Sequence, residues 1–144
     1  MSRWWEFYAA VYGIIKNDSG KILMQRRANT GFNDGILQLP SWHLEWEETY
    51  FQALKREMKE EINIDIDDSD IVLSHVWHRI HKWDRVYYDI YLEITKYRWE
   101  IKNNEPDKCS ELDFFDIHTP DFTPYNKIAL KHIQNKVVLS EITL

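Results

Sequence analysis

The sequence has a single cysteine, Cys109, and no long apolar segment. A lone thiol cannot form an intrachain disulfide, which favours a reducing, cytoplasmic setting. No stretch approaches the roughly 18 consecutive apolar residues that a membrane-spanning helix needs. Residues 1–6 also lack the basic start and the long apolar run of a secretory signal peptide. We therefore expect a cytoplasmic protein without membrane attachment.

Basic residues are in the minority, with 18 lysines and arginines against 24 aspartates and glutamates and a formal net charge of −6. A module that binds duplex nucleic acid normally carries a basic surface, so the charge argues against that class. A nucleotide substrate is still compatible with an acidic chain, because a divalent cation can carry positive charge to an acidic site.

The length of 144 residues predicts one compact domain spanning residues 1–144. Apolar runs separated by turn residues indicate strands, and two segments have helical periodicity. The expected strands are 7–15, 21–26, 36–39, 71–80, 85–94 and 111–117, and the expected helices are 49–62 and 125–135. The first two strands would pair as a hairpin around the turn at 17–20. This order predicts an α+β fold, an α/β/α sandwich with a mixed sheet.

The clearest helix, residues 49–62, carries acids on its polar side. Thr49 and Gln52 have the spacing of a capping box. Glu57, Glu60 and Glu61 are separated by three and four positions, so they share one helix face. Their repulsion opposes helix formation by roughly 0.2–0.5 kcal/mol per pair, and a divalent cation would reverse it. On this triplet alone, an ordinary solvated acidic face is the simpler explanation.

The wider spacing favours a functional reading. Residues 39–64, LPSWHLEWEETYFQALKREMKEEINI, closely resemble the Nudix box, Gly-x5-Glu-x7-Arg-Glu-U-x-Glu-Glu-x-Gly-U with U aliphatic. The charged positions match at Glu48, Arg56, Glu57, Glu60 and Glu61, and the aliphatic positions at Met58 and Ile64. The resemblance extends less specifically to residues 32–35 and 105–115, which look like a bacterial subgroup similar to MutT.

The resemblance implies a loop–helix–loop packed on a mixed sheet, with Mg²⁺ or alternatively Mn²⁺ as cofactor. Glu60 and Glu61 would be metal ligands, and Glu57 would be either a ligand or the base that deprotonates the attacking water. Arg56 would hold Glu48 or Glu57 in position, which fixes ligand geometry.

Two further metal ligands are expected. The backbone carbonyl of Ser41 matches a position that helps to bind metal in some relatives, and serine leaves a carbonyl unchanged. Another carboxylate could come from the strand at 111–117, where Glu111 and Asp113 point the same way. We favour Glu111, although a surface acid explains either residue equally well.

The implied reaction is hydrolysis of a nucleoside triphosphate, of the dNTP or oxidised dGTP type, to a nucleoside monophosphate and pyrophosphate. Water would attack a phosphorus, and metal ions would activate the water and neutralise the leaving group. Diphosphate sugars, dinucleotide polyphosphates and mRNA caps are alternatives within the family. Relatives are often dimers, so the resemblance also suggests a homodimer.

The segment departs from the box mainly in its loop. Trp42 and Asn63 replace the two box glycines, and Glu47 and Ser41 stand where neighbouring glycines are usual. Asn63 is benign because asparagine tolerates the left-handed conformation. Trp42 would be strained if its φ were positive, could narrow a phosphate channel, or could fold outwards against Trp46.

These departures leave a second hypothesis open, a weakened Nudix-fold module that binds a nucleotide or a protein. The intact acids argue against it. A protein-interaction domain is a third reading, and only the seven tryptophans favour it.

Substrate-binding residues are expected after the second strand. Arg26 and Arg27 end this strand and could bind phosphate, although a solvated strand end is an equal alternative. The candidate platforms for a base are Phe32, Trp77, Trp83 and Tyr88, although a core or hairpin role is the commoner explanation for each. Asn33 and Asp34 could hydrogen-bond a purine edge, but a role in the turn is the simpler explanation.

Overall fold

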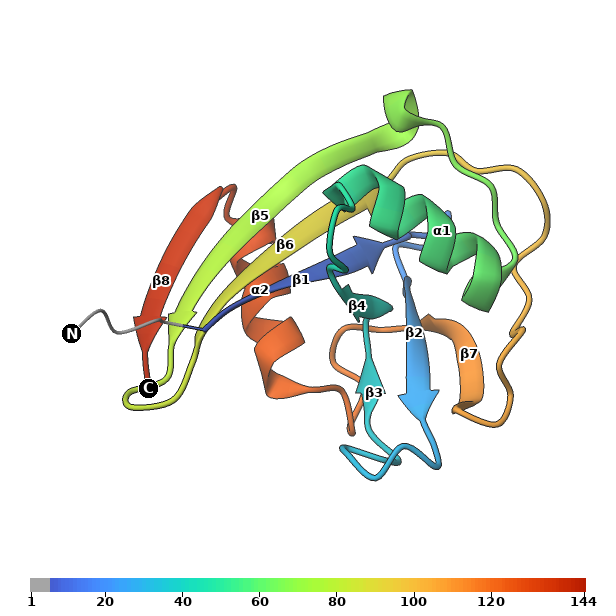
Figure 1. Cartoon of the computed structure of the whole chain (residues 1–144). Helices are drawn as coiled ribbons and strands as arrows, with labels where there is room; N and C mark the ends of the chain where they lie inside the picture. The colour runs from blue at the N-terminus through green and yellow to red at the C-terminus, as the bar shows by residue number, and fades with distance from the viewer. Residues whose placement is uncertain (1–5) are drawn as a thin grey trace.

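The computed structural model describes residues 6–144 (Figure 1). Residues 1–5, most of the segment considered above as a signal peptide, lie outside this range. The elements are β1 (Phe7–Ile14), β2 (Ile22–Arg27), β3 (Leu37–Gln38), β4 (Ser41–His43), α1 (Tyr50–Ile62), the 3-10 turn η1 (Asp68–Asp70), β5 (Ile71–Ile80), β6 (Val86–Ile94), β7 (Cys109–Phe115), α2 (Pro124–Gln134) and β8 (Leu139–Thr143).

The strands form a five-stranded sheet, β4-β1-β6-β5-β8, and a three-stranded sheet, β3-β2-β7. The larger sheet is mixed, because β1–β6 and β5–β8 are parallel while β1–β4 and β5–β6 are antiparallel. Figure 1 shows α1 and α2 on opposite sides of this sheet. The α+β prediction, with a mixed sheet flanked by helices, is confirmed.

Helix α1 covers one face of the large sheet. Leu54, Met58 and Ile62 are fully buried against Val11 of β1 and the inward side chains of β6. Gly13 permits this close approach, because a Cβ there would lie 2.1 Å from the terminal methyl of Met58. The capping box and the left-handed Asn63 at the helix end are present as predicted. Packing and caps therefore fix the orientation of the acidic face.

Helix α2 covers the opposite face. Ala129 and Leu130 pack with Trp77 of β5 and Tyr91 of β6. Ile128 lies on the outer side of the helix and is 43% exposed. Successive side chains of a strand point to opposite faces, so the sheet separates one apolar layer under α1 from another under α2. No helix within residues 6–144 is both long and apolar enough to cross a membrane.

Two predictions of local structure were wrong. The strands at 7–15 and 21–26 do not form a hairpin beyond one bridge between Lys16 and Ile22, because β1 pairs with β4 and β6 while β2 joins the other sheet. The loop expected at 41–43 is the short strand β4, whose entry is fixed by a 2.9 Å bond from Gly13 N to the carbonyl of Pro40. Strand β8 lies in a segment for which no element was expected.

Candidate active site

Arg56 gathers acids from two parts of the chain. Its Nε and Nη2 donate to the Glu48 carboxylate at 2.7 and 3.1 Å, and its Nη1 donates to Glu57 at 2.7 Å. A weaker contact of 3.4 Å reaches Glu60. Hydrogen bonding to Arg56 also lowers the pKa of Glu48 below its usual value. The loop before α1 is thus tied to the helix by a charged fork.

Glu61 has a different environment from the other acids of α1. Its carboxylate accepts a 2.8 Å hydrogen bond from the indole Nε1 of Trp42. Burial raises the pKa of Glu61 to about 7, the Trp42 bond opposes the rise, and Glu105 and Glu57 add to it through repulsion. No arginine or lysine is bonded to Glu61 in the described part of the chain. This position therefore favours a cation.

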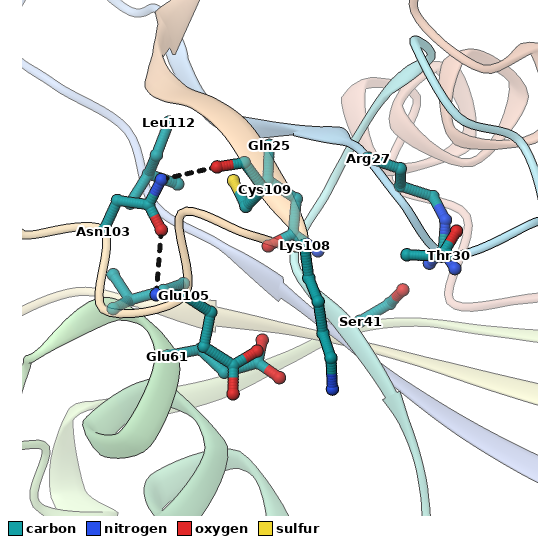
Figure 2. A pocket seen from close by; sticks show the side chains of 11 residues that line it. Gln25, Arg27, Thr30, Ser41, Glu61, Asn103, Glu105, Lys108, Cys109 and Leu112 are labelled. Carbon is teal, nitrogen blue, oxygen red and sulfur yellow. Dashed lines mark hydrogen bonds between the residues drawn. The ribbon is translucent and has the colours of Figure 1, made fainter.

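Glu105, which the sequence analysis did not single out as a candidate, is an acid outside α1 whose charge helps to raise the pKa of Glu61. Asn103 holds it in place, because Asn103 Oδ1 accepts from the Glu105 backbone N at 3.1 Å and Asn103 Nδ2 donates to the Cys109 carbonyl at 2.7 Å. Figure 2 shows the carboxylates of Glu61 and Glu105 pointing into the same space, with Lys108 beside them.

These side chains line a small cavity of about 130 Å³ between α1, β4 and the start of β7. Arg27 and Lys108 bring positive charge to it, and Glu61 and Glu105 bring negative charge. Ser41 lies on its wall. Strands β1 and β4 are joined by hydrogen bonds from Gly13 N to the Pro40 carbonyl and from Leu44 N to the Ala9 carbonyl. In this register Ser41 and Tyr12 face each other as a pair without backbone hydrogen bonds between them. The backbone N–H and carbonyl of Ser41 therefore point away from β1, at the outer edge of the sheet.

A second, larger cavity of about 450 Å³ adjoins the first and shares Arg27 and Ser41 with it. Phe32 and Asn33, which the sequence analysis named as candidate substrate-binding residues, both line it. Phe32 is 68% exposed and is held at the rim, since Arg27 Nε donates to its carbonyl at 2.8 Å. The two cavities together provide a charged compartment and an aromatic compartment.

Comparison with known proteins agrees with this geometry. The NUDIX domain family matches residues 6–136.

The chain belongs to the Nudix hydrolase family.

Among solved structures, the MutT NUDIX hydrolase from Burkholderia pseudomallei is similar with 23% identity and a TM-score of 0.75, over 88% of this chain and 97% of that one. The MutT protein from Methanosarcina mazei Go1 shares 18% identity with a TM-score of 0.76, over 94% and 98%. The ORF135 protein of E. coli shares 20% identity with a TM-score of 0.73, over 91% of each chain. At these identities the likeness concerns the fold.

The structure shows the conformation of the residues that replace glycine in the Nudix box loop. Trp42 has no positive φ; it lies in β4 paired with Val11 and is only 9% exposed. It neither packs outwards on Trp46, which is 93% exposed, nor carries backbone strain. The left-handed residue of the box loop is Glu47, with φ 65°. The conformation that usually calls for glycine is therefore found at Glu47.

Three other residues differ from their expected surroundings. Glu111 lies 3.4 Å from Arg26 on the neighbouring strand and does not join the acids of α1. Arg26 also donates to the Gly35 carbonyl at 2.8 Å, so it braces the loop. Cys109, two residues before the strand expected at 111–117, begins β7 and lines the small cavity, and burial raises the pKa of its thiol.

The acids of the Nudix box fit a divalent cation in their chemistry, although they are not preassembled around one point. Within residues 6–144, no three His, Cys, Asp or Glu side chains converge as a ready metal-binding set. The reason is visible in the contacts: Arg56 engages Glu57 and Glu60, and Trp42 engages Glu61. Hard carboxylate oxygens beside a free carbonyl are the donors that Mg²⁺ prefers.

Proposed function

We propose that this Nudix protein hydrolyses a nucleoside triphosphate to the monophosphate and pyrophosphate with the help of Mg²⁺. The observation that carries the proposal is the adjacency of the two cavities, which share Arg27 and Ser41. The triphosphate chain would lie in the charged cavity and the nucleoside in the larger one. A cavity of the latter size lies within the roughly 300–1,000 Å³ usual for small-molecule sites.

The residues that would hold the cation are Glu57, Glu60 and Glu61, with the Ser41 carbonyl and Glu105. Arg56 would keep Glu57 oriented while it also anchors the loop through Glu48. Bound Mg²⁺ neutralises phosphate oxygens and acidifies water. Arg27 and Lys108 would bind phosphate oxygens from the opposite wall.

In the reaction, a water oxygen forms a bond to phosphorus and the bridging oxygen leaves with the electron pair of the broken bond. The water proton passes to a carboxylate, for which Glu57 is the candidate. A positioned general base contributes typically 10²–10⁴-fold to the rate. Glu57→Gln keeps the size of the side chain and removes the carboxylate that would act as the base and as one ligand of the cation.

The test is a screen of nucleoside triphosphates with Mg²⁺, in which pyrophosphate and phosphate are measured separately. We expect pyrophosphate from the wild type, a loss of about 10²–10⁴-fold in kcat for Glu57→Gln, and no change for Glu141→Gln on the remote strand β8. If no triphosphate is hydrolysed while Mg²⁺-dependent binding persists, the chain is a nucleotide-binding module instead.

A further inference from the structure

Trp42, which stands at a glycine position of the Nudix box, is a rigid hydrogen-bond donor beside the acids of α1. It pairs with Val11 in the β4–β1 ladder and belongs to the same core cluster as Leu54 and Met58 of α1. Only 9% of its surface is exposed, so its ring is held in place by packing. From this position its Nε1 donates a 2.8 Å hydrogen bond to Oε2 of Glu61. The core of the protein thereby fixes one carboxylate oxygen of α1.

This contact orients Glu61 without neutralising its charge. An indole N–H is a neutral group that can only donate a hydrogen bond. It differs in this respect from Arg56, whose guanidinium brings a positive charge to Glu48 and Glu57. The bond from Trp42 therefore restricts the direction of the Glu61 carboxylate and leaves its negative charge available to a cation.

The second oxygen of the same carboxylate remains open. Within residues 6–144, Oε1 of Glu61 accepts no hydrogen bond, and it is not closed off from solvent. Glu61 lines the small cavity with Ser41 and Glu105, and Figure 2 shows the carboxylates of Glu61 and Glu105 directed into one space. Glu105 and Glu57 are close enough to repel the charge of Glu61. A cation at Oε1 would relieve this repulsion while the bond at Oε2 is kept.

We propose that Trp42 is a positioning residue for the cation site, whose indole N–H holds Oε2 of Glu61 so that Oε1 is presented to the divalent cation. The inference rests on the proposed function, because it takes Glu61 as a ligand of that cation. Partners that hold a metal ligand in one orientation contribute strongly to metal affinity. The opposite role is an obstruction, in which the cation has to break the Trp42–Glu61 bond. The two roles predict changes of opposite sign in cation affinity when the N–H is removed.

Titration with Mn²⁺, followed by electron paramagnetic resonance, measures that sign. Trp42→Phe keeps an aromatic ring in the core and removes the N–H, so we expect Mn²⁺ affinity to fall about tenfold. Trp46→Phe, the same change at an exposed side chain of the box loop, should leave Mn²⁺ affinity unchanged. Circular dichroism confirms that each variant is folded. An unchanged or higher Mn²⁺ affinity of Trp42→Phe would overturn the inference.

A double-mutant cycle separates positioning of Glu61 from a general structural role of Trp42. In a Glu61→Gln protein, the further change Trp42→Phe should cause no additional loss of Mn²⁺ affinity, because the N–H acts through the Glu61 carboxylate. A structural role would instead produce the same loss in both backgrounds. Equal losses in the presence and absence of the Glu61 carboxylate would contradict the inference.

Nuclear magnetic resonance of the indole N–H groups tests the wild-type protein itself. If Mg²⁺ binds while the Trp42–Glu61 bond is kept, the Trp42 N–H should exchange with solvent no faster in Mg²⁺ than in EDTA. Added Mn²⁺ should broaden the Trp42 resonance before that of Trp83, which is 92% exposed and lies in the turn between β5 and β6. Faster exchange of the Trp42 N–H in Mg²⁺ would show that the cation displaces the indole, and the inference would fail.

Failure of the inference can be distinguished from failure of the proposed function. If Glu61→Gln weakens Mn²⁺ binding but Trp42→Phe does not, the inference fails and the cation site of the proposed function stands. If Trp42→Phe weakens Mn²⁺ binding through Glu61 but no triphosphate is hydrolysed, the inference stands and the hydrolytic proposal fails. If the wild type binds no Mn²⁺, both fail.

Discussion

Two arginines in this molecule differ in the number of carboxylates that surround them. Arg56 faces four acids, Glu45, Glu48, Glu57 and Glu60, and its side chain is 32% exposed. Arg79 meets Asp89 alone, deep in the sheet. The first group has an excess of negative charge that one guanidinium cannot neutralise, and the second is balanced within itself.

The difference indicates how each site treats a ligand. The excess acids beside Arg56, with Glu61 and Glu105 close by, favour an added cation and, through it, an anionic polyphosphate. The balanced pair is costly to disturb and has no excess charge to attract an added ion. Charge therefore distinguishes the two groups: the acids around Arg56 can accept a cation, and the Arg79–Asp89 pair is already neutral.

The largest expected effect concerns the stability of the balanced pair. Asp89→Leu leaves Arg79 buried and unpaired, and should lower the free energy of unfolding by about 3–5 kcal/mol. The double variant Asp89→Leu with Arg79→Met should recover most of the loss. Arg56→Met should cost less than Asp89→Leu, because water reaches its partners. Urea unfolding measures all three, and an equal loss for Asp89→Leu and the double variant would contradict this account.

Trp42 should show a smaller effect that arises from its indole N–H. Trp42→Phe keeps the aromatic ring and removes the hydrogen bond to Glu61, so unfolding free energy should fall by about 1.5–3 kcal/mol. Trp46→Phe, the same change at a 93% exposed side chain, should stay within about 0.5 kcal/mol of the wild type. Thermal or chemical unfolding compares them. A more stable Trp42→Phe would mean that Trp42 is an obstruction after all.

His75 should give the smallest effect, a change in stability with pH. Burial lowers its pKa, the Val137 carbonyl opposes this, and nearby His132 adds to the lowering. The folded state therefore binds the proton more weakly than the unfolded chain, so stability should decline as pH falls below about 6.5. His75→Gln should flatten this decline, whereas His118→Gln on an exposed loop should not. Unfolding curves between pH 5 and 8 decide the matter, and parallel curves for wild type and His75→Gln would refute it.

The fold was largely predictable because the decisive signals are local. The periodicity and caps of α1, from Thr49 to Asn63, are confirmed in the structure, as is the α+β class. The hairpin was wrong because adjacency in sequence says little about which sheet a strand joins. Whether β1 pairs with β2 depends on competition from β4 and β6, which lie far along the chain.

The candidate site was predictable where spacing along one helix carries it. Arg56 does meet both Glu48 and Glu57, the two partners considered from the sequence. Glu105 and the Arg79–Asp89 pair were missed because they depend on contacts between separate elements. The one local signal was Asn103, two positions before Glu105, because asparagine side chains often hydrogen-bond the backbone two residues further on. The roles of all these residues in catalysis and metal binding are still predictions.

The central claim, that the unneutralised acids of α1 capture a divalent cation, is tested most directly by Mn²⁺ titration followed by electron paramagnetic resonance. The wild type and the remote variant Glu141→Gln should bind Mn²⁺ with equal affinity, and Mg²⁺ should displace the bound Mn²⁺. Glu61→Gln should weaken Mn²⁺ binding by about tenfold or more, because each ligand contributes a large part of the binding free energy. Equal affinity in all three proteins would contradict the account.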